Sequence, residues 1–283
     1  MASLKDIRNR ITSVQKTQKT TSAMKMVSAA KLRRAEEAAR SAQPYSQQLR
    51  QVVSSLSSRF TGDEVPLFQK PEGHRTAVVV LTSDRGLCGG FNMNLCKAVA
   101  AKLGKDGIAQ ADLYVIGRKG GDFFRRTSHK IVEYHTELTA AEEQKVVRDM
   151  IATVSHRFLN GEVDRVHLAF NTYVSVISQR PTLNTLLPIT PPEDAGGDER
   201  EVLFEPSAEE ILQSLLEKYI QNQVYSALLE THAGEHAARM TAMDSATKNA
   251  GEMIDKLQLF YNRTRQAAIT KELIEIISGA ETL

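Results

Sequence analysis

The feature that most constrains this chain is its C-terminal run from Ser207 to Ala280, 74 residues without a proline. Only Gly234 and Gly251 interrupt it before Gly279. Apolar residues recur along it at steps of three and four, which indicates one amphipathic helix. At 1.5 Å per residue this helix would be roughly 110 Å long, far longer than a compact domain is wide. It therefore needs a second helix along its apolar stripe.

The N-terminal segment offers that second helix. Its first apolar residues form a heptad seam: Leu4, Ile7, Ile11 and Val14. We expect the stripe to continue through a second group: Ala23, Met24, Val27 and Ala30. Pro44 is the one residue expected to kink or break this helix, because proline has no backbone N–H to donate. Both ends of the chain are thus long helices without a partner of their own, and antiparallel pairing with each other is the economical solution.

Between the end helices, short β-branched runs alternate with helical ones. Thr76–Thr82 is a continuous apolar run, typical of a strand buried on both faces. Further strands are expected at Leu113–Ile116, Lys130–Tyr134, Arg165–Phe170, Tyr173–Ile177 and Leu183–Leu187, and helices at Asn94–Leu103, Gly120–Arg126 and Ala140–Asn160. This alternation predicts an α/β layer with a mainly parallel sheet. The predicted fold class is therefore α/β plus a long coiled coil, with an N-terminal helix in 1–60, a Rossmann-like domain inserted at 74–205 and a C-terminal helix in 207–283.

Charge and composition exclude some classes and leave others open. The net charge is +2, but residues 1–50 carry eleven Lys or Arg and three Asp or Glu, a net of +8. A basic N-terminal helix can meet nucleic acid, a membrane surface or an acidic protein surface, and a nucleic-acid-binding coiled coil is the alternative interpretation. No run of 18 apolar residues exists, and the N-terminus lacks the apolar core of a signal peptide. Cys88 and Cys96 are too few for a disulfide framework or a zinc site.

Two motifs suggest chemistry. His232–His236 fits the H-x-x-E-H zinc pattern, but it stands in the middle of a helix without an evident third ligand, so two exposed helix histidines are the preferred interpretation. Ser83–Phe91 follows a strand and precedes a helix, as phosphate loops do. It lacks the Lys-Ser/Thr of a P-loop and does not match G-x-G-x-x-G, so we favour a tight connection with a glycine at positive φ. A Rossmann-type enzyme is therefore not expected.

The last turns of the C-terminal helix combine polar donors with crowded apolar residues. Arg265, Gln266 and Thr270 precede four large apolar side chains: Leu273, Ile274, Ile276 and Ile277. Four such residues in five positions cover too much of the helix circumference for one partner helix. Besides an ordinary solvated helix end, the sequence therefore allows a tip that lies inside another protein.

Three blocks of residues resemble the gamma subunits of the rotary ATP synthases, and together they cover essentially the full chain. They lie in Ile7–Val27, in Ser83–Asn92 and in Glu235–Gly279. Thr20 and Ser22 stand where the family often has Ile and Lys, and Gly234 where it often has Ser. The order and spacing of the blocks make the resemblance specific.

The resemblance implies a non-catalytic central rotor shaft. In this family the end helices form a left-handed antiparallel coiled coil inside a ring of three alpha and three beta subunits, with one copy of the shaft per complex. The α/β domain contacts the epsilon subunit and the membrane ring of c subunits. The implied location is the cytoplasmic face of the bacterial plasma membrane, held there through the complex. No cofactor, metal or nucleic acid is implied, and catalysis belongs to the alpha–beta ring.

The resemblance also assigns contacts by position. Arg265, Gln266 and Thr270 match residues that hydrogen-bond a loop of beta or alpha, and Met24 and Lys25 lie at the level of the acidic C-terminal region of beta. The resemblance places Phe204 and Glu205 near epsilon and the c ring. Ile274, Ile276 and Ile277 would turn in a nearly apolar sleeve of the ring.

Overall fold

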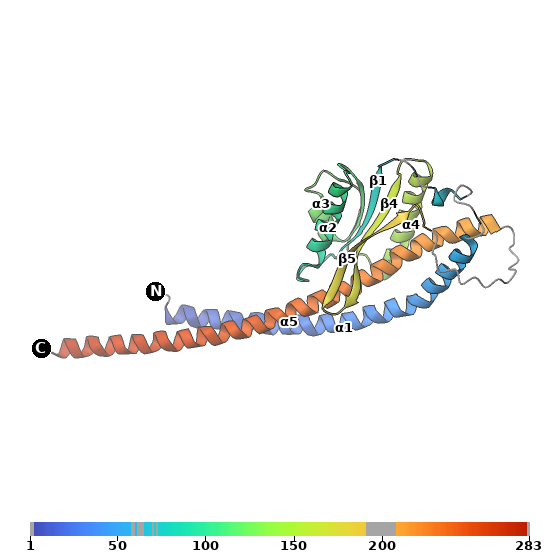
Figure 1. Ribbon diagram of the computed structural model, residues 1–283. Coiled ribbons are helices and arrows are strands. Elements are labelled where there is room, and N and C mark those ends of the chain that lie inside the picture. Colours follow the sequence, from blue (N-terminus) through green and yellow to red (C-terminus); the bar gives the residue numbers. More distant parts are fainter. Residues whose placement is uncertain are drawn as a thin grey trace. The chain divides into compact units, whose positions relative to one another are not determined.

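The computed structural model describes residues 3–57, 60, 65–69, 71, 73–190 and 208–281. The chain divides into two compact units. Unit 1 consists of Met1–Ala29 and Arg239–Leu283, and unit 2 consists of Ala30–Ala238. The two longest helices, α1 (Leu4–Ser57) and α5 (Ala208–Glu281), each contribute to both units (Figure 1). The predicted long helices at both ends are therefore confirmed.

Helix α1 begins at a capping box. Asp6 N–H donates to Ser3 Oγ at 3.2 Å, and Ser3 N–H donates to Asp6 Oδ2 at 3.1 Å, so each side chain satisfies a backbone donor of the other residue. Of the kink or break predicted at Pro44, the break is wrong, because α1 continues through that residue to Ser57. Pro44 is exposed, and so is Arg40, whose carbonyl loses its helical donor and can be hydrated instead.

The buried face of α1 follows one strict heptad seam. Most of its buried and half-buried positions step by three and four from Leu4 to Leu56: Leu4, Ile7, Ile11, Val14, Gln18, Thr21, Lys25, Ser28, Leu32, Ala35, Ala39, Ala42, Ser46, Leu49, Val53 and Leu56. The other covered positions flank this seam: Ser22, Met24, Glu36, Ser54 and Ser55. The predicted continuation of the stripe is wrong at Ala23, Val27 and Ala30, which are exposed. Only Met24 of that group is half-buried. The error arose because the seam carries polar residues here, so hydrophobicity alone pointed to the wrong face.

In unit 1 the two helices lie side by side and antiparallel (Figure 1). Arg8 Nη2 donates to the Tyr261 hydroxyl at 3.0 Å, the hydroxyls of Thr21 and Thr247 are 2.8 Å apart, and Lys25 Nζ lies 2.6 Å from Asp244 Oδ1. Along this part of the pair, higher residue numbers on α1 thus face lower residue numbers on α5, as in an antiparallel pair. Within unit 2 the same helices also pair antiparallel, where Asn222 Nδ2 donates to Ser46 Oγ at 2.9 Å. The predicted antiparallel pairing is confirmed.

Unit 2 contains a five-stranded sheet in the order β3-β2-β1-β4-β5. The strands are β1 (Thr76–Leu81), β2 (Asp112–Ile116), β3 (Lys130–His135), β4 (Arg165–Ser175) and β5 (Ser178–Leu187). Strands β3, β2, β1 and β4 are parallel neighbours, and β5 pairs antiparallel with β4. The mainly parallel, Rossmann-like sheet is confirmed. One prediction needs correction: Tyr173–Ile177 is not a separate strand, because β4 continues to Ser175 and turns directly into β5.

The helices of unit 2 cover both faces of the sheet, as Figure 1 shows. These are α2 (Phe91–Lys105), α3 (Arg118–Phe124) and α4 (Ala140–Leu159), with the short 3-10 helix η1 at Pro66–Phe68. Alternate residues of β1 enter different cores, and all six are buried. Val78 and Val80 pack with α2, whereas Val79 and Leu81 pack with α4 and with the parts of α1 and α5 in unit 2. A strand between two cores must be apolar on both faces, which explains its uninterrupted β-branched run.

Candidate interaction surfaces

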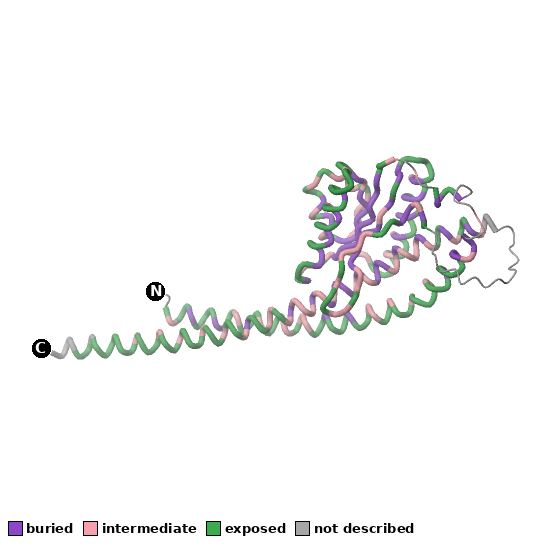
Figure 2. Tube along the Cα trace, in the orientation of Figure 1, coloured by how far each residue is buried: buried purple, intermediate pink, exposed green. Residues whose placement is uncertain are grey.

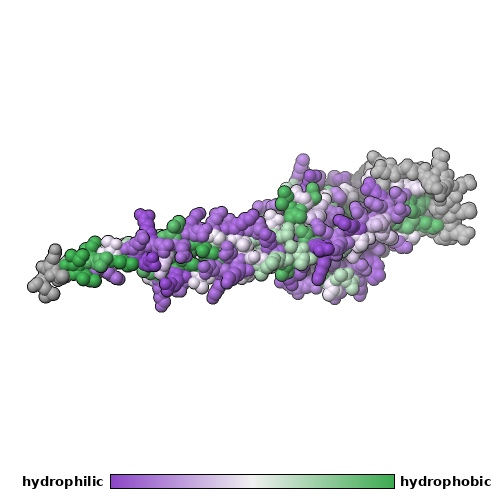
Figure 3. Space-filling view, turned by 90° about the horizontal axis from the view of Figure 1, so that it is seen from below, coloured by the Kyte–Doolittle hydropathy of each residue, from purple (hydrophilic) through white to green (hydrophobic). Residues whose placement is uncertain are grey.

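The end of α5 extends past its partner helix in unit 1. Arg8, which contacts Tyr261, lies only four residues after the first residue of α1. From Arg265 onward, α5 therefore has about one further turn at most of α1 beside it. Five large apolar side chains in this stretch are exposed: Ile269 (49%), Leu273 (54%), Ile274 (58%), Ile276 (68%) and Ile277 (59%). Figure 3 shows apolar side chains gathered over this end of the helix.

The predicted polar contact residues lie on the same stretch. Arg265, Gln266 and Thr270 are all exposed. The Thr270 hydroxyl donates to the Gln266 backbone carbonyl at 2.9 Å, one helical turn back. The structure thus brings the predicted polar donors and apolar residues together on one helix end, with their outward faces available to another chain.

The second predicted pair, Met24 and Lys25, is half-buried against α5. Lys25 Nζ and Lys248 Nζ lie 2.6 and 2.9 Å from the two carboxylate oxygens of Asp244. The hydrogen bonds from Lys25 and Lys248 lower the pKa of Asp244 to about 2. Lys25 is therefore engaged within the helix pair, and its side chain keeps 45% of its surface exposed.

Sequence reasoning missed an exposed apolar face on α1. Met26 and Val27 are 65% and 56% exposed, and Ala23 is exposed on the same side. Extending the heptad seam of Leu4, Ile7, Ile11 and Val14 by its own spacing would have placed these residues outside. The remaining predicted contact residues, Phe204 and Glu205, lie outside the described residues.

The H-x-x-E-H motif is not a pair of exposed histidines. His232 and His236 are both half-buried, and His232 Nε2 lies 2.8 Å from Glu143 Oε1 of α4. Burial by itself lowers the pKa of His232, but the hydrogen bond and charge of Glu143, with the charges of Glu235 and Asp84, outweigh burial and raise it. Among the described residues, no group of three His, Cys, Asp or Glu side chains is placed to hold a metal ion. The motif forms an interhelical contact.

The His232–Glu143 contact predicts a specific pH dependence. Because the folded pKa of His232 is raised above its unfolded value, the contact stabilises the fold fully below the unfolded pKa, and this contribution is lost as the pH rises through the folded pKa. We expect the stability difference between the wild-type chain and His232→Gln to be largest at pH 5.5 and to shrink by pH 8.5. Urea unfolding at both pH values measures it, and a difference that grows with pH would contradict the assignment.

The Ser83–Phe91 loop is a tight strand–helix connection. Gly89 has a φ of +58° and Leu87 a φ of +62°. Ser83 N–H donates to Asn92 Oδ1 at 2.9 Å, and Asn92 Nδ2 donates back to Ser83 Oγ at 2.8 Å. The Cys88 side chain is buried in this loop. Ser83 and Asn92 thus close the loop on itself, while the Asp84 carboxylate accepts from the backbone N–H groups of Arg118 and Glu137. The predicted tight connection with a glycine at positive φ is confirmed.

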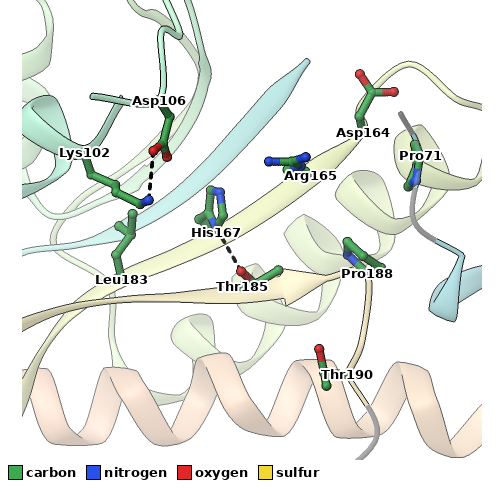
Figure 4. Close-up of a pocket in the computed structure, with 10 residues that line it drawn as sticks. All are labelled: Pro71, Lys102, Asp106, Asp164, Arg165, His167, Leu183, Thr185, Pro188 and Thr190. Carbon is green, nitrogen blue, oxygen red and sulfur yellow. Dashed lines mark hydrogen bonds and ion pairs between the residues drawn. The ribbon is translucent and has the colours of Figure 1, made fainter. Parts of the chain in front are cut away.

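A cavity of about 560 Å³ lies at the other end of the sheet, where β4 begins and β5 ends. Figure 4 shows its lining, with Lys102 paired to Asp106 at 2.9 Å and His167 directed at Thr185. Asp164 points away from these groups and pairs with Arg75 at 2.8 Å. Burial and the neighbouring Lys102 lower the pKa of His167 below its usual range. Lys102, Asp106 and Asp164 of this cavity are thus used in ion pairs, and its charged groups do not converge on one point.

Three features together indicate a subunit of a larger assembly. They are the pairing of the two long end helices, the α/β domain inserted between them and the apolar helix end without a partner helix. None of the helices in the described ranges is long and apolar enough to span a membrane. A family model described as ATP synthase matches residues 3–283. The chain therefore belongs to the ATP synthase family and, within it, to the gamma chains.

The curated relatives are gamma chains over their full lengths. The ATP synthase gamma chain of Anaeromyxobacter sp. (strain Fw109-5) is 50% identical over 290 residues, and that of Pelotomaculum thermopropionicum is 45% identical over 284 residues; each match covers 100% of both chains. The basic N-terminal helix thus needs no nucleic-acid partner to explain it, and nothing in these matches supports the nucleic-acid interpretation.

Solved structures share the fold at lower identity. A chain in the Euglena gracilis mitochondrial ATP synthase (OSCP/F1/c-ring, rotational state 3) has a TM-score of 0.69 and 21% identity, covering 99% of this chain and 94% of its own. A chain in the Tetrahymena thermophila mitochondrial ATP synthase (central stalk/c-ring) has a TM-score of 0.58 and 23% identity, covering 80% of this chain and 99% of its own.

Proposed function

We propose that this chain is the central rotor shaft of a bacterial ATP synthase and that it makes or breaks no bonds itself. It couples ion-driven rotation of a membrane c ring to conformational changes in the catalytic alpha–beta ring. The observation that carries this proposal is the end of α5, where five apolar side chains are exposed beyond the partner helix in a chain of this family. A large exposed apolar surface of this kind marks a site where another protein binds.

The coupling works through different affinities for different states. A shaft with unlike faces contacts each beta subunit differently as it turns, and it therefore favours a different conformation of each one. This mechanism needs surfaces, and it needs no catalytic group on the shaft. The partners are three alpha and three beta subunits, an epsilon subunit and the c ring, with one copy of this chain per complex. The complex holds the chain at the cytoplasmic face of the plasma membrane.

Each predicted surface has a role in this proposal. Arg265, Gln266 and Thr270 hydrogen-bond a loop of the ring, and Ile274, Ile276 and Ile277 turn in an apolar sleeve that offers few fixed hydrogen bonds. Met24 and Lys25 face the acidic C-terminal region of beta. The exposed neighbours Met26 and Val27 extend that surface with apolar area. Phe204 and Glu205 lie near epsilon and the c ring.

Reconstitution tests the proposal directly. The purified full-length chain is expected to show no ATPase activity alone and to restore ATPase activity when it is mixed with isolated alpha and beta subunits. Alpha and beta without this chain are the control. Substantial ATP hydrolysis by the chain alone, or no stimulation of alpha and beta, would refute the rotor assignment.

A further inference from the structure

The two motifs that looked like chemistry in the sequence meet each other in unit 2. In a doubly wound sheet, ligands bind outside the carboxyl ends of the strands where the strand order reverses, which here is between β1 and β4. The loop after β1 leads into Phe91, whose backbone carbonyl accepts a hydrogen bond from Asn171 Nδ2 of β4 at 3.1 Å. The Phe91 ring lies directly against Gly234 of α5, where a Cβ atom would come within 2.9 Å of it. Helix α5 thus lies where a ligand binds in other doubly wound folds.

Hydrogen bonds hold α5 at this place from two sides. Glu230 Oε2 accepts from the Tyr173 backbone N–H of β4 at 3.3 Å, and His232 Nε2 bonds Glu143 Oε1 of α4 at 2.8 Å. Residues 230 and 234 share one face of a helix, whereas residue 232 points about 200° around from residue 230. The contacts of Glu230 and Gly234 with the sheet side therefore oppose the contact of His232 with α4.

Tyr173 joins both long helices to the sheet. Its backbone binds Glu230 of α5, and its hydroxyl donates to Glu36 Oε1 of α1 at 2.6 Å. Burial, with the hydrogen bond to Glu36, raises the pKa of Tyr173 to about 12, so the hydroxyl keeps its donor proton at physiological pH. One residue of β4 thus fixes the rotational position of the two helices relative to the α/β domain.

The burial of α5 within unit 2 agrees with this arrangement. From Tyr219 to Ala238 every residue is buried or half-buried, so this part of the helix has no free face within unit 2 (Figure 2). The preceding apolar contacts, such as those of Leu216 and Ile220, bury this part of α5 in the shared core but form no directional bonds. The hydrogen bonds at Glu230 and His232 are directional, and they oppose such rotation.

We propose that the contacts of Tyr173 with Glu36 and Glu230, and of His232 with Glu143, form a clamp that carries torque between the α/β domain and the helix pair. This inference rests on the proposed function, because only a rotating shaft is loaded in this way. The residues of the clamp are positioning residues, since they act through the orientation of the two helices. The crevice that binds dinucleotides in other doubly wound folds serves here to grip a helix.

The test uses the full-length chain with the double substitution Tyr173→Phe and His232→Asn, which removes one directional bond to each helix and changes little volume. The matched control is Tyr45→Phe, because Tyr45 is 58% exposed on α1. Hydrogen exchange on the free chain is expected to show amides of 230–238 exchanging about tenfold faster in the double variant, the effect of losing a hydrogen bond to a charged group. If the exchange rates of these amides stayed unchanged, the contacts of Tyr173 and His232 would not hold α5 in place, and the clamp would be refuted.

The second measurement is single-molecule rotation of the chain assembled with alpha and beta, with a load attached to the α/β domain. We expect the double variant to rotate at the wild-type rate without load but to stall at a lower torque, with Tyr45→Phe behaving as wild type. An equal stall torque, or an equal loss in the control, would overturn the clamp. If complexes with the wild-type chain show no rotation, the proposed function is refuted. The hydrogen-exchange result then still decides whether the clamp residues hold α5 against the α/β domain.

Discussion

Ile276→Asp is expected to lower ATP-driven ion pumping by the assembled complex at least about tenfold. The residue is 68% exposed on the end of α5 beyond α1, and the proposal places it in an apolar sleeve. A carboxylate in apolar surroundings costs several kcal/mol unless it is paired, and about 1.4 kcal/mol already changes an equilibrium constant tenfold. The free chain should fold normally, because this side chain contacts little of its own unit.

Ion uptake by membrane vesicles that contain the complete complex, measured beside their ATP hydrolysis, checks this prediction. Ile276→Leu is the matched control, since leucine keeps the apolar volume and favours the helix equally well or better. The control should pump as the wild type does. Normal assembly and coupled pumping by Ile276→Asp would show that Ile276 does not turn in an apolar sleeve.

Leu216→Ala is expected to lower the free energy of unfolding of unit 2 by about 2–5 kcal/mol. Leu216 is fully buried on α5, in the core that α5 shares with α4, β1 and the end of α1. Alanine would leave a cavity between a long helix and the sheet, and neither can move without disturbing the rest of this core. The loss is large because most domains are stable by only about 5–15 kcal/mol.

Urea unfolding of the full-length chain, followed by hydrogen exchange in β1 and α4, measures this loss. Lys218→Ala, two residues further along the same helix, is the control, because Lys218 is exposed. Its unfolding midpoint should stay close to that of the wild type. If both substitutions shifted the midpoint equally, the helix would not be anchored through Leu216.

The covering of α5 changes along its length in a way that matches these two predictions. Every residue from Tyr219 to Asp244 is buried or half-buried, whereas between Glu252 and Ala268 only about one residue in three or four is half-buried. The residues whose burial is described from Ile269 to Ile277 are exposed. Substitutions in the first part are therefore expected to affect folding, and those in the last part to affect assembly with other chains.

The sequence by itself determined the elements and their order. A proline-free run of 74 residues with apolar residues at steps of three and four indicates a long helix, and the β-branched apolar run of β1 is typical of a buried strand. It also determined the unusual helix end, because four apolar residues in five positions are visible without a structure. These features are set by local backbone preference and by the period of apolar residues, both of which a single chain displays.

Tertiary structure alone decided which groups meet. Pro44 is tolerated because it is exposed beside an unbroken seam, and Val27 is exposed because Thr21, Lys25 and Ser28 find partners or cover on the inner face. His232 is an interhelical contact because α4, far away in the sequence, brings Glu143 to it. For the inner face of α1 and for His232 the physical reason is the same: a polar side chain can be buried when a distant residue satisfies it, and no local pattern records that distant partner.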